Sequence, residues 1–279
     1  MVQRYRLDHI CFFDEEFFVH RKWATAVAEI IGGQFSWCAQ TRSADLLRVD
    51  LKKMEKCGLM VVAPGLESGS DRILKFIKKN ETVKEYVEAN RRLSETGIFA
   101  QYNFIIGYPS ETREELNQTI DLILQLLKEN DHALVNQLSP LTPLPGTELL
   151  RQVVRDYGFV EPARLEEWIQ VTRGKQEKPW LDKESLRRIR FLYYTSYFLC
   201  SAERYSQKFK IPKWVFRAYS RTVHLRWRKK WFRLDWEVPL LRLLFKWFVN
   251  PVDYAATASL QETERFKANQ INIQIAPAC

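Results

Sequence analysis

The sequence predicts an α/β protein in which a parallel sheet is covered by helices, followed by a helical C-terminal region. Two observations carry this prediction. Apolar, β-rich runs alternate with helical patterns five times in about the first 150 residues, and from Tyr157 onward the alternation stops. Five units are too few for an eight-unit barrel, so we expect an open or partial barrel, or a doubly wound sheet.

The expected strands are short apolar segments that each stop at polar or glycine-bearing residues. They cover residues 7–13, 35–40, 59–63, 98–106 and 134–138. Right-handed crossovers bring the carboxyl ends of parallel strands to one side of a sheet. We therefore expect the loops after these strands to meet along a common rim.

The helices between the strands carry clear start signals. Ser70 is placed to cap a helix that begins at Asp71. Thr82 and Thr112 are each followed three residues later by glutamate, the pattern of a capping box. The expected helices cover 19–31, 46–57, the residues from 71, 82–96 and 112–128, with a further one after Thr147.

The C-terminal part has a different composition. Asp182 is placed to cap a long helix that runs to about Lys208, and two aromatic, basic helices split near Pro239 follow Pro212. The chain is accordingly divided into a barrel core at 1–156, a connector at 157–181, a helical tail at 182–250 and a flexible extension at 251–279.

The net charge of +9 is concentrated in the tail, where residues 211–250 hold ten Lys or Arg and two acids. Basic residues mixed with Trp, Phe and Leu over 213–249 suit a helix lying on an anionic membrane surface. A helical cap that buries the aromatic side chains explains the same pattern. No nucleic-acid partner is expected, because the tail is too apolar to follow a phosphate backbone.

The five cysteines are scattered, with no two within four residues of each other. This spacing excludes a local CxxC motif and a secreted disulfide pattern, and isolated thiols fit a reducing cytoplasm. The N-terminus lacks the apolar run of a signal peptide, and no apolar stretch has transmembrane length. We therefore expect a cytoplasmic protein, which would be peripheral to the inner face of the membrane where the tail lies on a membrane and not where it caps the barrel. The four histidines form no HxH or HxxxH pair, and no metal site of side-chain type is expected.

The segment VVAPGLESGS, residues 61–70, shows how a strand tip could form a site. A strand turns at Pro64 and Gly65 and exposes Glu67 beside a helix start. This arrangement is typical of ligand sites in α/β proteins. Taken alone, the segment is explained more simply as an ordinary βα loop whose polar residues cap the helix.

Five motifs in order, "FFDEEF", "WCAQTR", "LESGSDRIL", "FIIGYPSETREEL" and "TPLPGTEL", resemble the radical S-adenosylmethionine (SAM) enzymes. The nearest subgroup usually carries an N-terminal cobalamin-binding domain and includes the anaerobic cyclase of chlorophyll synthesis and various methyltransferases. The resemblance covers roughly residues 4–150. It implies a TIM-like partial barrel of six βα units, whose first strand carries a CxxxCxxC loop for a 4Fe-4S cluster that cleaves SAM to a 5′-deoxyadenosyl radical.

This sequence departs from the family in one respect, because it contains no CxxxCxxC. By the resemblance, its start falls at the family's second strand, so we expect the C-terminal portion of a longer enzyme. The first βα unit would be missing, and neither the 4Fe-4S cluster nor cobalamin would bind this chain alone. The implied reaction is radical methylation, cyclisation or rearrangement of a small lipid-like or aromatic substrate. The alternative is a non-catalytic remnant or a membrane-associated partner subunit.

The resemblance also implies roles at the first two strand tips. Asp14 and Glu15, with Glu16, would receive the amino group of SAM, and carboxylates suit an ammonium group. A solvated acidic loop is an equal alternative. Arg42 would pair with a carboxylate of the cofactor or substrate. A surface ion pair with Asp45 carries equal weight.

At the later strand tips the implied roles concern the nucleoside. Glu67 and Ser68 would lie near the ribose or the methionine moiety. Gly107, Tyr108 and Pro109 would form the turn that approaches the adenine, since glycine permits close approach. A helix cap explains the residues just after this turn. The loop at Thr142 would border the substrate or only rigidify the chain; no catalytic residue is assigned.

Overall fold

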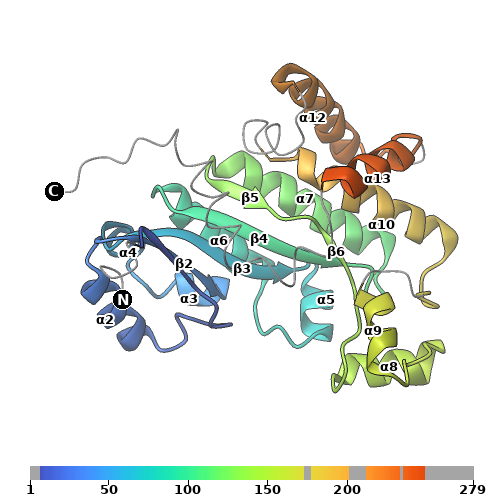
Figure 1. Ribbon diagram of the computed structural model, residues 1–279, viewed down its shortest axis with the longest axis horizontal. Coiled ribbons are helices and arrows are strands. Elements are labelled where there is room, and N and C mark those ends of the chain that lie inside the picture. The colour runs from blue at the N-terminus through green and yellow to red at the C-terminus, as the bar shows by residue number, and fades with distance from the viewer. Residues whose placement is uncertain (1–6, 173–176, 201–211, 233–234, 249–279) are drawn as a thin grey trace.

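Strand order settles which α/β architecture the chain adopts (Figure 1). The computed structural model describes residues 7–172, 177–200, 212–232 and 235–248. Five parallel strands pair in sequence order, and β6 pairs with β4: β1 (His9–Phe12), β2 (Ser36–Thr41), β3 (Leu59–Glu67), β4 (Phe99–Ile106), β5 (Ala133–Val135) and β6 (Ser139–Pro140). A doubly wound sheet needs a reversal of this order, so the α/β prediction is confirmed in its partial-barrel form.

The helices of the barrel begin where the capping signals place them. Both expected capping boxes are present, at Thr82 and at Thr112, and Ser70 accepts from the backbone of Ile73. Gly32 ends α2 in the left-handed conformation. The barrel helices are α2 (Arg21–Ile31), α3 (Ser43–Leu46), α4 (Leu51–Lys56), α5 (Asp71–Phe76), α6 (Val83–Ser94) and α7 (Arg113–Glu129).

One face of the sheet packs against these helices and holds the core. Trp37 and Tyr102 are fully buried there. Tyr102 donates through its hydroxyl to Asn90 of α6 at 2.7 Å, and Asn90 donates to the carbonyl oxygen of Leu126 in α7 at 3.2 Å. This buried bond pair ties β4 to two helices. It thereby fixes where the strand tips lie.

The C-terminal region is helical, as expected. Its later helices lie beside α7, whereas its first two lie near α5 (Figure 1). Trp227 of α12 is fully buried and donates its indole N–H to Thr195 at 3.0 Å, and Phe216 is buried as well. The tail therefore caps the barrel with part of its aromatic face. None of the described helices combines the length and the apolar character that crossing a membrane requires. The elements are α8 (Glu148–Tyr157), α9 (Leu165–Thr172), α10 (Lys183–Thr195), η1 (Ser196–Phe198), α12 (Lys213–Arg228) and α13 (Glu237–Phe248).

Two expected boundaries in the barrel are wrong. Strand β3 does not stop at residue 63 but continues through Pro64 and Gly65 to Glu67, with a register irregularity against β4. The helix expected at 46–57 is interrupted, because Asp50 caps a new helix by accepting from the backbone of Lys53 at 3.0 Å.

The tail boundaries also differ. Helix α10 ends at Thr195 and passes into the 3-10 turn η1, whereas the expected end near Lys208 falls outside the described residues. The break between α12 and α13 precedes Pro239, which lies in the first turn of α13, where proline replaces an N–H that has no helical partner. The expected connector contains α9, and the extension at 251–279 is outside the described residues.

Candidate functional site

Residues from the tips of β1, β2 and β3 meet on one rim of the sheet, as expected for parallel strands. Arg42 follows β2, and its Nε lies 3.9 Å from Glu16 of the loop after β1 and 3.5 Å from Glu81 of the loop before α6. Lys79 of that same loop lies 3.5 Å from Glu67, at the tip of β3. We call these five residues the rim cluster.

Glu67 occupies a strained position in the rim cluster. Its φ of +65° is in the left-handed region, which residues other than glycine rarely adopt. Its carboxylate folds back over Gly65, where an added Cβ would lie 2.5 Å from Oε1. Burial raises the pKa of Glu67, and the nearby Lys79 ammonium opposes that rise. Strain of this kind persists where the surroundings hold it and is common at ligand sites.

Glu81 is the buried centre of the rim cluster. Its Oε1 accepts from the backbone N–H of Ala44 at 2.9 Å. Its Oε2 lies 3.5 Å from Arg42 Nε and 3.8 Å from Lys79 Nζ. Both Glu81 Oε2 and Arg42 Nε are buried without a hydrogen-bond partner among the described residues. The two atoms face each other as an ion pair at 3.5 Å without a hydrogen bond. Buried charges without hydrogen bonds are costly, so a hydrogen bond to either atom from water or a ligand would be stabilising.

Arg42 also fixes the loop that carries Lys79. Its Nη2 donates to the carbonyl oxygens of Lys79 and Asn80, the latter at 3.3 Å. The ion pairs of Arg42 among the described residues go to Glu16 and Glu81, so the alternative of a surface pair with Asp45 is wrong. Part of the guanidinium is therefore committed to the fold, and only Nε faces the carboxylates.

Ser68 lies beside Glu67 but faces the interior. Its side chain is fully buried. The hydroxyl lies 3.3 Å from Thr119 Oγ1 and accepts from the backbone N–H of Ser70 at 3.1 Å. Thr119 also accepts from Gly69 at 2.9 Å. These bonds tie the β3 tip to α7, which leaves Glu67 as the side chain of this pair that lies in the rim cluster.

The tip of β4 is held by partners inside the protein. Gly107, at φ +81°, donates its N–H to Glu111 at 2.7 Å and accepts from the indole N–H of Trp180 at 2.9 Å. An added Cβ on Gly107 would lie 2.8 Å from Ile189 of α10. Tyr108 and Pro109 are buried, and Tyr108 packs with Leu141. Gly107 therefore allows Trp180 and Ile189 of the C-terminal region to lie close to its backbone.

Two glutamates near the β4 tip differ in their proton affinity. Burial raises the pKa of Glu111 to about 7, and its Oε1 is buried without a hydrogen-bond partner among the described residues. Hydrogen bonding from Arg72 lowers the pKa of Glu115 to about 2. Arg72 donates to both Glu115 oxygens, through Nε at 2.5 Å and Nη2 at 2.6 Å. Glu115 is thus a structural anion, whereas Glu111 exchanges its proton near neutral pH.

Among the described residues, no hydrogen bond or ion pair joins the other expected site residues to the rim cluster. Asp14 and Glu15 are exposed in the loop after β1. Thr142 lies after β6, and its hydroxyl donates to the carbonyl of Pro140 at 3.3 Å. Their proposed contacts with SAM or substrate stay predictions.

Sequence reasoning missed Lys79 and Glu81. They belong to the segment KKNE, which has the composition of a solvated turn. Its unusual backbone, with Lys78 at φ +57° and Asn80 at φ +55°, is visible only in the structure. A second missed feature is a row of amides beyond the rim. Gln101 donates to Asn136 at 2.6 Å, and Asn136 donates to Asn103 at 2.5 Å.

The prediction of isolated thiols is wrong for one pair. Cys11 and Cys38 stand opposite each other on β1 and β2 and are joined in a disulfide. The expectation of a reducing compartment rests on isolated thiols. Cys11 and Cys38 are not isolated thiols, so they do not support that expectation. Cys57 and Cys200 lie elsewhere in the fold. The described cysteines do not form the three closely spaced thiolates that a 4Fe-4S cluster needs, so they do not fit that cofactor.

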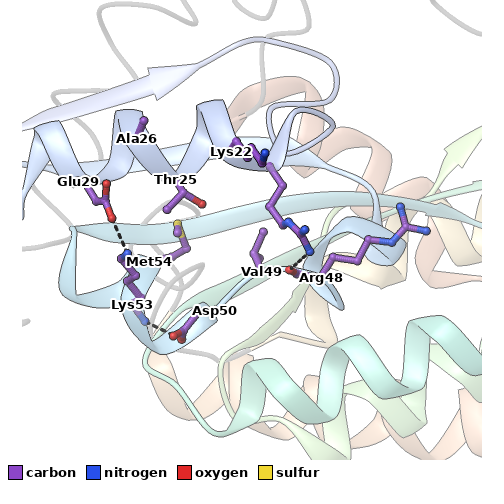
Figure 2. Close-up of a pocket in the computed structure, with 10 residues that line it drawn as sticks. Lys22, Thr25, Ala26, Glu29, Arg48, Val49, Asp50, Lys53 and Met54 are labelled. Carbon is purple, nitrogen blue, oxygen red and sulfur yellow. Dashed lines mark hydrogen bonds and ion pairs between the residues drawn. The ribbon is translucent and has the colours of Figure 1, made fainter.

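A surface pocket of about 430 Å³ lies on the helical layer between α2 and α4 (Figure 2). Lys53 bridges its floor by pairing with Glu29 at 2.5 Å, and Arg21 donates to the carbonyl of Arg48 at 3.3 Å. No residue of the rim cluster lines this pocket. It is a groove between helices and is separate from the candidate site.

Comparison with known proteins agrees with the fold and the motifs. The radical SAM superfamily model matches residues 1–123. An uncharacterized methyltransferase of Pyrococcus horikoshii is 36% identical over 148 residues, which are 52% of this chain and 31% of that protein. The anaerobic magnesium-protoporphyrin IX monomethyl ester cyclase of Cereibacter sphaeroides is 30% identical over 165 residues, which are 53% of this chain and 26% of the cyclase.

Among solved structures, the cobalamin-dependent SAM radical enzyme OxsB superposes with a TM-score of 0.57. Its sequence identity is 14%, and the match covers 96% of this chain and 51% of OxsB. The likeness therefore concerns the fold. The chain spans about a third of the length of the curated relatives it matches, or less. Together with the sequential parallel sheet and the strand-tip motifs, these matches show that residues 1–123 are similar to the radical SAM superfamily.

Proposed function

We propose that this chain forms the SAM-binding rim of a radical SAM enzyme that carries out radical methylation, cyclisation or rearrangement. The supporting observation is the rim cluster, in which Glu81 Oε2 and Arg42 Nε are buried and accept or donate no hydrogen bond within the part of the chain that the structure describes. The reaction class comes from the relatives, a methyltransferase and a cyclase. The substrate we propose is a small lipid-like or aromatic molecule.

The charges of the rim cluster suit SAM. The cluster holds three carboxylates and two cations, and SAM carries an ammonium, a sulfonium and a carboxylate at neutral pH. In this proposal Glu67 accepts hydrogen bonds from the ribose hydroxyls. The outer carboxylate of Glu16 and the exposed Asp14 and Glu15 attract the ammonium group. The guanidinium edge of Arg42 pairs with the carboxylate of SAM.

The Fe-S chemistry is assigned elsewhere. The sequence has no CxxxCxxC, and the described cysteines do not fit a 4Fe-4S cluster. We propose that this cluster and cobalamin are held by residues outside this chain, so that it acts as one portion of a longer enzyme. Bound SAM is the source of the radical in this family; the residues described here bind and orient it.

Equilibrium binding tests the proposal directly. We expect the purified chain to bind SAM under anaerobic conditions, and Glu67→Gln to weaken binding about ten-fold, since it removes a charge-assisted hydrogen bond. Glu88→Gln is the matched control, because Glu88 is a helical glutamate outside the rim cluster that pairs with Arg91 and whose side chain is 45% exposed. Equal SAM affinity of the two variants, or no SAM binding by the wild-type chain, would contradict the proposal.

The alternative function is a non-catalytic remnant or a partner subunit held at a membrane. It is favoured by the solvent-facing part of the tail, where Trp214, Trp236, Leu240 and Leu243 are all at least half exposed. Exposed Arg and Lys side chains of α12 accompany them, including Arg221. Indoles and basic groups together suit the headgroup region of an anionic bilayer. In this proposal the protein is peripheral to the inner face of the membrane.

Vesicle co-sedimentation tests this alternative. We expect binding to vesicles that contain phosphatidylserine, weaker binding to phosphatidylcholine alone, and loss of binding as salt rises. Trp214→Ala should reduce the bound fraction several-fold, because an interfacial indole is lost. Leu165→Ala, at an exposed apolar residue of α9, is the control. Membrane binding without SAM binding would support the partner subunit over the enzyme portion.

A further inference from the structure

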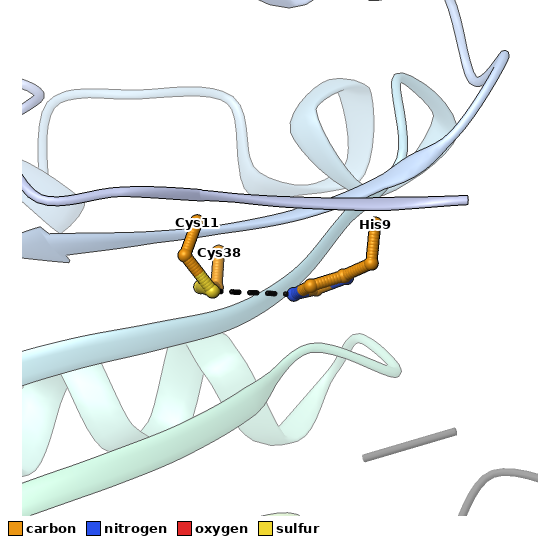
Figure 3. Close-up of side chains that lie close together, drawn as sticks. All are labelled: His9, Cys11 and Cys38. Carbon is orange, nitrogen blue, oxygen red and sulfur yellow. Dashed lines mark hydrogen bonds between the residues drawn. A yellow bond between two sulfur atoms is a disulfide. The ribbon is translucent and has the colours of Figure 1, made fainter. Parts of the chain in front are cut away.

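A second group of reactive side chains lies on the sheet, apart from the rim cluster. His9 and Cys11 are on β1 and Cys38 is on β2 (Figure 3). Alternate residues of a strand face the same side, so His9 and Cys11 share one face. The register places Cys11 opposite Cys38, with Cα atoms 4.8 Å apart. One potential ligand atom from each residue lies within 4.8 Å of the other two.

The imidazole of His9 is oriented from outside this group. Ser36 donates its hydroxyl hydrogen to the carbonyl oxygen of Asp8 at 3.0 Å. The same hydroxyl oxygen lies 2.8 Å from His9 Nδ1. The tautomer in which His9 Nδ1 donates to Ser36 leaves the lone pair on Nε2, where a metal can take it up. Nε2 lies 3.4 Å from the sulfur of Cys11. Such an orienting bond is typical of metal-binding histidines.

The spacing of these atoms suits zinc. Bonds of about 2.3 Å to sulfur and about 2.0 Å to nitrogen in a tetrahedral site place S and N roughly 3.6 Å apart. The observed distance of 3.4 Å between Cys11 Sγ and His9 Nε2 is close to this value. The side chain of Cys11 is exposed, so a fourth position is open to solvent.

We propose that His9, Cys11 and Cys38 form a redox-gated zinc site. In the disulfide form the sulfurs bond each other and the site is closed. A small dithiol transfers two electrons and two protons to the disulfide, which yields two thiols on the protein and a cyclic disulfide from the reductant. Zn²⁺ then binds both sulfurs and Nε2, and the two thiol protons pass to solvent.

This zinc site does not rest on the proposed SAM binding. None of its three ligands belongs to the rim cluster, and all three lie within β1 and β2, before the loops at the strand tips. Zinc binding can fail while SAM binding persists, and the reverse also holds. The two proposals are therefore tested separately.

Zinc binding and thiol protection test the site in the wild-type chain. The protein is reduced with dithiothreitol, exchanged into anaerobic buffer without reductant and titrated with Zn²⁺, in parallel with an untreated oxidised sample. We expect one bound zinc per reduced chain and none per oxidised chain. We also expect zinc to slow alkylation of Cys11 and Cys38 by iodoacetamide at least ten-fold. The thiol of Cys57, mapped in the same mass-spectrometric digest, should be unaffected.

Variants then assign the ligands. Cys38→Ser should abolish stoichiometric zinc binding, and His9→Ala should weaken it at least ten-fold. Cys57→Ser should leave zinc binding unchanged. Equal zinc uptake by oxidised and reduced chains, equal protection of Cys57, or wild-type affinity in Cys38→Ser would each overturn the proposal. The protection experiment uses the unaltered chain, so misfolding of a variant cannot imitate its outcome.

Discussion

The tips of β3 and β4 both place carboxylates beside a helix start, but they differ in how each charge is satisfied. At the β4 tip, Arg72 contacts both oxygens of Glu115, and Ser70 adds a hydrogen bond at 3.1 Å. At the β3 tip, Glu67 has its cation, Lys79, at 3.5 Å. A carboxylate whose oxygens both accept short hydrogen bonds from the protein stabilises the fold. A buried carboxylate whose cation lies at 3.5 Å can still accept hydrogen bonds from a ligand.

This difference explains why motif matching and geometry assign different weights to the same residues. The turn at Gly107 carries the more recognisable motif, yet its backbone N–H and C=O are both engaged by Glu111 and Trp180. The rim cluster draws on Lys79 and Glu81, which carry no motif, but two of its buried charged atoms have no hydrogen-bond partner among the described residues. Glu111 Oε1 at the β4 tip shares that property, so what sets the rim cluster apart is that its unpaired atoms lie within a group of five charged side chains.

The largest expected effect comes from breaking the tight pair at the β4 tip. Arg72→Met keeps an apolar stem but leaves Glu115, whose side chain is about 10% exposed, without its cation. We expect a loss of about 2 kcal/mol in the free energy of unfolding at pH 7, measured by urea denaturation. Because Arg72 holds the pKa of Glu115 at about 2, below its usual value, this stabilisation is present above about pH 4.5 and is lost as the pH falls towards 2.

The matched control for that pair is Arg91→Met, which removes solvent-accessible helical ion pairs with Glu88 and Glu95. It should cost much less than Arg72→Met, since exposed pairs contribute little. Equal losses in the two variants, or a loss that does not diminish in acid, would show that Glu115 does not depend on its cation.

Replacing the buried carboxylate of Glu111 is expected to stabilise the protein at alkaline pH. Burial raises its pKa to about 7, so its contribution to stability is complete below about pH 4.5 and is lost as the pH rises through 7. Glu111→Gln keeps an acceptor for the Gly107 N–H and removes the buried charge. We expect the variant to be more stable than wild type by roughly 1–2 kcal/mol at pH 8 and equal to it near pH 4. A difference between the two proteins that stays constant from pH 4 to pH 8 would contradict this assignment.

The smallest expected effect separates strain from function at the two tips. Glu67 and Ser110 both adopt φ of +65°, where glycine is favoured. Glu67→Gly and Ser110→Gly should each raise the free energy of unfolding by about 1 kcal/mol. Only Glu67→Gly should weaken SAM binding, because only Glu67 belongs to the rim cluster. SAM affinity that falls equally in both variants would remove the distinction between the tips.

Local signals in the sequence determined most helix starts. The capping boxes at Thr82 and Thr112 and the cap at Ser70 involve residues three apart, so they form whatever the rest of the chain does. The alternation of strand and helix determined the α/β class for a similar reason, because hydrophobic period reports local conformation. Convergence of the strand tips followed from the handedness of parallel crossovers.

Only the tertiary structure decided which strands, cysteines and loops are paired with one another. The choice of a partial barrel rests on strand order, which no local pattern encodes. The disulfide of Cys11 with Cys38 depends on register between strands 27 residues apart, and the buried carboxylate of Glu81 meets Arg42 only when two loops are packed together. Such long-range pairings are set by packing of the whole core, so residue spacing along the chain carries little information about them.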